Sequence, residues 1–67
     1  MSDQLIELFR EELVKETLEI IAEHQVVRIR DLYNIIPTAE SEKIEILHRV
    51  LEHNFIVTNG EYLKITH

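Results

Sequence analysis

Residues 26–66, VVRIRDLYNIIPTAESEKIEILHRVLEHNFIVTNGEYLKIT, decide the fold of this chain. The stretch opens with β-branched residues, which favour a strand. Two short helical patterns follow, and two strand-like runs then flank Asn59 and Gly60. Asn-Gly between apolar runs is a strong signal for a two-residue β-hairpin turn. This order predicts a small α+β domain with three helices, a C-terminal hairpin and a short third strand at residues 26–28.

The first helical pattern within this stretch covers residues 30–36. Its expected inward residues are Leu32, Ile35 and Ile36. Pro37 ends it, because a proline biases the preceding residue away from helical geometry.

The second helical pattern is expected to begin after an N-cap at Thr38. Glu40 and Glu42 then fall in the first turn, where the helix dipole favours negative charge. Asn54 suits the left-handed residue that closes a helix. The expected inward face consists of Ile44, Ile46, Leu47, Val50 and Leu51.

A two-residue turn fixes the register expected for the hairpin: Thr58 faces Glu61. The next pairs are Val57 with Tyr62 and Ile56 with Leu63. One side of the hairpin then carries Ile56, Leu63 and Ile65, and the opposite side carries Phe55, Val57 and Tyr62. Both sides are partly apolar, whereas the strands of a hairpin with one solvent-exposed face should alternate between apolar and polar residues.

The segment before residue 26 is expected to be helical from a cap at Ser2 or Asp3 to about His24, as one helix or as two. Its core stripe comprises Ile6, Phe9, Leu13, Val14, Ile20 and Ile21. Three leucines, Leu5, Leu8 and Leu18, lie outside this stripe. They either pack on the hairpin of the same chain or form a dimer seam. The seam is favoured because the core of one small domain cannot cover this much apolar surface. We therefore expect a homodimer.

The composition indicates one small domain without disulfide bonds. The chain has 67 residues, no cysteine and a formal net charge of −6. No apolar run approaches the roughly 18 residues of a membrane span. We expect a soluble, intracellular, cytoplasmic protein forming a single domain over residues 1–67, in which residues 1–17 extend a core of residues 18–66.

Several short segments share the pattern of one family: LEII (18–21), VRIRDL (27–32), the positions Ile44, Leu47 and Val50, NFI (54–56) and VTNGEY (57–62). Together they resemble a winged helix-turn-helix domain. The resemblance covers residues 18–66, and it indicates fold more than function. In this family the third helix often enters the major groove of DNA, and the hairpin forms a wing.

The charges expected on the third helix depart from that use. Its exposed residues would be Ser41, Glu42, Glu45, His48, Arg49 and Glu52, with three negative charges and one positive. Affinity for DNA rests on cations that neutralise phosphates. The wing tip carries Glu61, and its nearest base is Lys64.

The leading hypothesis is therefore a non-catalytic protein-interaction module: an adaptor, regulator or inhibitor that binds a protein partner. The acidic stripe Glu12, Glu16, Glu19 and Glu23 favours a basic partner. The expected partner-binding residues are Glu42, Glu45, His48, Arg49, Glu52, Phe55, Val57 and Tyr62. The alternative is a dimeric DNA-binding transcriptional regulator. Its DNA contacts would come from Arg28, Arg30, Ser41, Lys43, His48, Arg49 and Lys64.

Catalysis and metal binding have little support in the sequence. There is no cysteine nucleophile, and Ser2 and Ser41 lack an evident base. Glu45, His48 and Glu52 share a helix face, but one helix supplies too few metal ligands. We expect no enzymatic activity, no cofactor and no metal.

Overall fold

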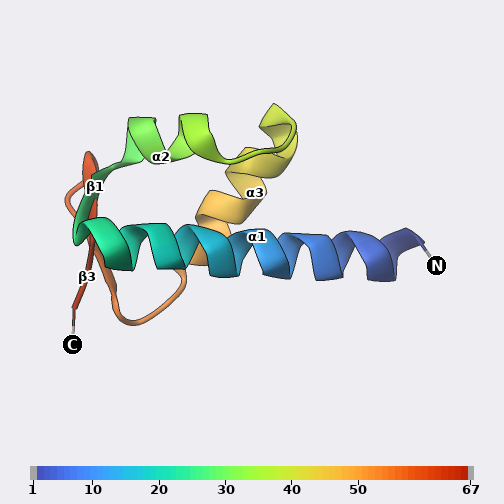
Figure 1. The fold of residues 1–67 in the computed structure, drawn as a ribbon, viewed down its shortest axis with the longest axis horizontal. Coiled ribbons are helices and arrows are strands. Elements are labelled where there is room, and N and C mark those ends of the chain that lie inside the picture. Colours follow the sequence, from blue (N-terminus) through green and yellow to red (C-terminus); the bar gives the residue numbers. More distant parts are fainter. Residues whose placement is uncertain (1, 67) are drawn as a thin grey trace.

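The computed structural model describes residues 2–66, apart from the side chain of Ser2. Within this range lie three helices and three strands (Figure 1). They are α1 (Ser2–His24), β1 (Val26–Arg28), α2 (Ile29–Ile35), α3 (Glu40–Leu51), β2 (Ile56–Thr58) and β3 (Tyr62–Ile65). The fold is a small α+β domain consistent with a winged-helix-like architecture, as the sequence predicts.

Helix α1 is one continuous helix of 23 residues that runs along the long dimension of the molecule (Figure 1). It stops where Gln25 adopts a left-handed conformation, with φ 69°. The N–H of Gln25 still donates to the carbonyl of Ile21 at 2.8 Å. This residue turns the chain out of α1 and into β1 (Figure 1).

The three strands form an antiparallel sheet in the order β1-β3-β2, at the C-terminal end of α1 (Figure 1). The predicted hairpin register was wrong by two residues along β3. Thr58 pairs with Leu63, not with Glu61. The other observed pairs are Val57 with Lys64 and Ile56 with Ile65. Because the shift is even, every side chain keeps its predicted side of the sheet.

Side chains in the turn explain the shifted register. The N–H groups of Glu61 and Tyr62 both donate to Oδ1 of Asn59, each at 2.9 Å. The N–H of Gly60 donates to Oγ1 of Thr58 at 3.0 Å. These amides are therefore satisfied by side chains, and a wider turn replaces the two-residue turn. Tyr62 pairs with Arg28 of β1 instead of with β2.

The core lies between the helices and the inner side of the sheet. Leu63, on the central strand, is fully buried together with residues from every helix. The buried apolar residues are Leu13, Val14, Ile21, Val27, Leu32, Ile36, Ile46, Val50 and Leu63. Leu13 and Val14 thus contribute to the same core as the residues of the winged-helix-like region.

Five residues predicted to face the core are exposed. They are Ile6, Phe9, Ile35, Ile44 and Leu51. The first two lie near the N-terminal end of α1, which reaches beyond the sheet and α2 (Figure 1). Ile35 and Leu51 are the last residues of α2 and α3, and Ile44 lies on the exposed side of α3.

The predicted caps of α3 were also wrong. The N-cap is Ala39, without a side-chain hydrogen bond, so Thr38 lies one position too early to cap the helix. The N–H of Thr38 donates to the carbonyl of Ile36 at 2.9 Å in a tight turn. The C-cap is Glu52 in a right-handed helical conformation. Among the described non-glycine residues only Gln25 has a positive φ, so Asn54 does not.

Candidate protein-binding groove

A groove of about 1010 Å³ runs between α1, α3 and the end of β3. Its lining combines apolar side chains at the bottom with charged side chains along both edges. The lining residues are Glu11, Val14, Lys15, Leu18, Glu19, Ala22, Glu45, His48, Arg49, Glu52, His53 and Ile65. It is larger than a second hollow beside α2.

Helix α1 supplies the floor of this groove. Val14, Leu18 and Ala22 follow one another at intervals of four residues, so they lie in a row along one side of the helix. Val14 is buried, whereas Leu18 is partly covered and Ala22 is exposed. Ile65 of β3 extends the apolar floor from the inner side of the sheet. The row therefore continues the core outward to the surface.

Helix α3 supplies the opposite wall. Glu45, His48, Arg49 and Glu52 occur at spacings of three, one and three residues, which places them on one side of the helix. Arg49 is held firmly: its Nε donates to Glu45 at 2.8 Å. Its two terminal nitrogens donate to the Glu7 carboxylate of α1 at 2.8 and 3.0 Å.

These bonds belong to a longer chain of ion pairs between α1 and α3. Arg10 donates to both oxygens of Glu42, at 2.7 and 2.9 Å, and to Glu7 at 3.1 Å. The order is Glu42–Arg10–Glu7–Arg49–Glu45, named here the α1–α3 ion-pair chain. Hydrogen bonds from Arg49 and then Arg10 lower the pKa of Glu7. The hydrogen bond from Arg10 lowers the pKa of Glu42.

The lining of the groove is acidic overall. It contains four glutamates against Lys15 and Arg49, a net charge of −2 with the histidines neutral. Arg49 is already paired with Glu7 and Glu45, so little of its positive charge is available to a ligand. The exposed stripe Glu12, Glu16, Glu19 and Glu23 continues the negative charge beside the groove along α1.

The structure divides the predicted partner-binding residues among three places. Four of them, Glu45, His48, Arg49 and Glu52, line the groove. Glu42 lies in the ion-pair chain. Phe55 is close to the groove, since its ring centroid is 5.0 Å from that of the lining residue His53. Val57 and Tyr62 lie on the outer side of the sheet.

That outer side also holds part of the predicted DNA-binding set. Lys64 lies between Val26 and Val57 in one cross-strand row, and Arg28 pairs with Tyr62 in the next. Arg28 donates to the Tyr62 hydroxyl at 3.1 Å and lies 5.5 Å from its ring centroid. Arg28 and Arg30 border a smaller hollow of about 610 Å³ beside Gly60.

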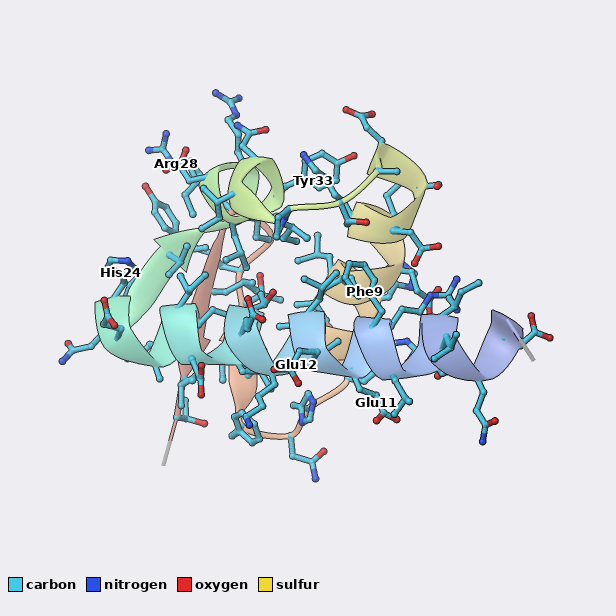
Figure 2. All side chains as sticks on the ribbon, turned by 45° about the vertical axis from the view of Figure 1, so that its right-hand side comes forward. Phe9, Glu11, Glu12, His24, Arg28 and Tyr33 are labelled. Atoms are coloured by element: carbon cyan, nitrogen blue, oxygen red, sulfur yellow. The ribbon has the colours of Figure 1, made fainter. Side chains whose placement is uncertain are left out.

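The remaining predicted DNA contacts are scattered over α3. Ser41 and His48 are exposed. Lys43 lies 5.0 Å from the ring centroid of Tyr33, and Arg49 points to α1. Of the predicted DNA-binding residues, Arg28, Arg30 and Lys64 therefore lie around the sheet and the start of α2. Figure 2 shows Arg28 and Tyr33 near opposite ends of α2.

The three leucines of the predicted dimer seam differ in their exposure. Leu5 and Leu8 are 70% and 60% exposed. Leu18 was expected to be exposed, but it packs partly against the core and lines the groove. Figure 2 shows Phe9, another exposed residue, on the opposite side of α1 from the groove residue Glu11.

Sequence reasoning missed the α1 side of the groove: Glu11, Lys15, Ala22 and the neighbouring Ile65. The available signal was the spacing of residues 11, 14, 15, 18, 19 and 22, which forms a stripe along the helix. Nothing in the sequence indicated that this stripe borders α3 but lacks a covering element.

The chain matches no family model, no curated protein and no solved structure. None of the described helices is long and apolar enough to cross a membrane.

Proposed function

We propose that this protein is a non-catalytic protein-interaction module that binds a segment of a partner protein in the groove between α1 and α3. The observation that carries the proposal is the partly uncovered apolar floor at Leu18, Ala22 and Ile65. An apolar surface rimmed by polar residues is typical of interaction sites. Four of the residues expected to bind a partner line the same groove.

The charge distribution supports a protein ligand over groove-inserted DNA. Helix α3 contains two basic residues besides its histidine, Lys43 and Arg49. Arg49 is paired with two carboxylates, and Lys43 lies over Tyr33. The side of α3 away from the groove instead presents Glu40, Ser41 and Ile44, which are all exposed. Carboxylates at this surface work against contact with phosphates.

DNA binding is the second candidate, and one observation favours it: Arg28 and Arg30 come together beside the hairpin tip at Gly60. Anisotropy of a labelled mixed-sequence duplex, measured at low and moderate salt, tests this candidate. Salt-sensitive binding that is lost in Arg28→Glu/Arg30→Glu would support a DNA-binding regulator. Absence of binding at low salt, where phosphate contacts are strongest, would argue against general DNA binding.

The interaction proposal is tested with a substitution that fills the groove. Ala22 is exposed and lies on the groove floor, so Ala22→Arg should obstruct a ligand without disturbing the core. Gln4→Arg is the matched control, because it adds the same charge to an exposed position of α1 away from the groove. Tagged chains are used to isolate bound proteins, which are quantified by mass spectrometry.

A genuine partner should be recovered with the unmodified chain and with Gln4→Arg, and should be reduced at least tenfold with Ala22→Arg. Equal thermal unfolding temperatures for the two variants would show that folding is intact. Retention of every specific partner by Ala22→Arg would refute the groove as the binding site.

A further inference from the structure

We infer that the segment bound in the groove is a basic amphipathic α-helix of about three turns. This inference rests on the proposed function and specifies the chemistry of the partner. The α1 residues that line the groove extend from Glu11 to Ala22. At about 1.5 Å per residue, this stripe is roughly 16 Å long, close to three turns of an opposing helix.

The shape of the lining favours a helix. Val14, Leu18 and Ala22 form a row with a spacing of four residues, and such rows are the ridges between which the side chains of another helix pack. The small side chain of Ala22 leaves room for close approach at one end. The wall from Glu45 to Glu52 runs over two turns of α3. A bound helix would therefore contact two helices at once and cover the exposed part of Leu18.

The backbone chemistry also favours a helix over an extended strand. A strand that binds by extending a sheet needs free backbone groups at a sheet edge. The groove is walled by side chains of α1 and α3, and Ile65 is its only lining residue from the sheet. A bound helix satisfies its own backbone hydrogen bonds, so it loses little when its apolar side enters the groove.

Charge complementarity determines the polar flanks of the helix. Glu11 and Glu19 lie on the α1 side of the groove, and Glu45 and Glu52 lie on the α3 side. Glu45 is already paired with Arg49. The other three carboxylates take part in none of the ion pairs among the described residues. Lysine or arginine on both flanks of an apolar stripe would complement this arrangement.

The test uses three labelled 18-residue peptides and the full chain. The first carries a helical leucine stripe flanked by lysines, and the second has glutamates in place of those lysines. The third has the composition of the first in an order that abolishes the stripe. Binding is measured by fluorescence anisotropy. We expect the first peptide to bind at least tenfold more tightly than either of the others. We also expect its affinity to fall as the salt concentration rises.

Two double variants locate the binding site. Glu19→Lys/Glu52→Lys reverses two exposed charges in the groove, and Glu16→Lys/Glu23→Lys makes the same charge change on the exposed stripe of α1 outside the lining. The variant Glu19→Lys/Glu52→Lys should bind the lysine-flanked peptide at least about tenfold more weakly, because charges at the rim of a binding site attract and retain the ligand. The second should have less than a threefold effect.

Equal binding of the scrambled peptide, equal effects of the two double variants, or preference for the glutamate-flanked peptide would each overturn the inference. If none of the helical peptides binds, but Ala22→Arg still recovers less of a cellular partner than the unmodified chain does, the partner segment is not a basic helix and the interaction function stands. If Ala22→Arg retains every partner, the proposed function itself fails.

Discussion

Single residues in this protein carry backbone constraints that can be tested directly. Gln25 ends α1 with a φ of 69°, in the left-handed region that a residue with a Cβ atom seldom adopts. Its side chain is exposed. Gln25 lies at the turn between α1 and β1, and the packing of both elements compensates for the cost of this conformation.

Replacing Gln25 with glycine should raise the free energy of unfolding by about 0.5–1 kcal/mol, since glycine adopts the left-handed conformation at no steric cost. Urea denaturation measures the change.

Gly60, with a φ of 96°, provides the opposite test. Gly60→Ala meets no atom within 4 Å and should still lower stability by about 1 kcal/mol through backbone strain. A loss of stability in Gln25→Gly would contradict this account.

At the same scale, the candidate site was partly predictable. Glu45, His48, Arg49 and Glu52 were singled out from their helical spacing, and all four line the groove. The environment of Arg49 was not predictable, because its partner Glu7 lies 42 residues away in the sequence. Leu18 was assigned to a dimer seam, yet it packs against the core.

At the scale of elements, α1 and α3 are joined near the N-terminal end of α1 by ion pairs and not by a buried apolar layer. Ile6 and Phe9 are exposed in that region, while Glu7 and Arg10 make the contacts with α3. Folding lowers the pKa of Glu7 and of Glu42 below the usual 4.5. The crossing of these two helices should therefore depend on pH.

The expected pH dependence follows from the sign of these shifts. Because the two pKa values are lower in the folded chain, the ion pairs stabilise it fully above about pH 4.5. This contribution is lost as the pH falls below 4.5 through the folded-state values. Glu7→Gln/Glu42→Gln should flatten the acid limb of stability, measured as urea midpoints from pH 6 to pH 3.

Arg10→Gln is the companion variant, since Arg10 bonds to both carboxylates. It should lower stability at pH 6 and also flatten the acid limb. An acid limb as steep in both variants as in the unmodified chain would show that the ion pairs do not contribute to the pH dependence.

At the scale of the whole molecule, the chain leaves a second apolar surface near the N-terminal end of α1. Leu5 and Leu8 are exposed three residues apart, on the side of α1 that continues into the acidic stripe. A two-fold pairing of two copies centred near Leu8 would cover these residues and leave most of the acidic stripe outside the contact. Homodimer formation remains a prediction.

Leu8→Glu should convert such a dimer to monomers, because it places a carboxylate at the centre of the apolar contact. Sedimentation equilibrium measures the mass. Leu51→Glu is the matched control, an exposed leucine on α3. A dimer that survives Leu8→Glu would exclude this seam, and dissociation by both variants would indicate a general loss of structure.

The sequence by itself determined the elements, their order and the sides of the hairpin. Asn-Gly marked the turn, β-branched residues marked β1, and helical periodicity identified Leu13, Ile21, Ile46 and Val50 as core residues, all of which are buried. These features follow from local conformational preferences and from the period of each element. The hairpin sides remained correct under the wrong register because the shift was even.

Only the tertiary structure decided which apolar residues are covered and where a partner segment has room to bind. Ile6 and Ile44 follow the same periodicity as buried residues, yet no element of the described chain covers them. The pairing of Glu7 with Arg49 and the open side of Leu18 depend on how α1 crosses α3. That crossing is set by the packing of distant side chains in three dimensions, which no local pattern in the sequence specifies.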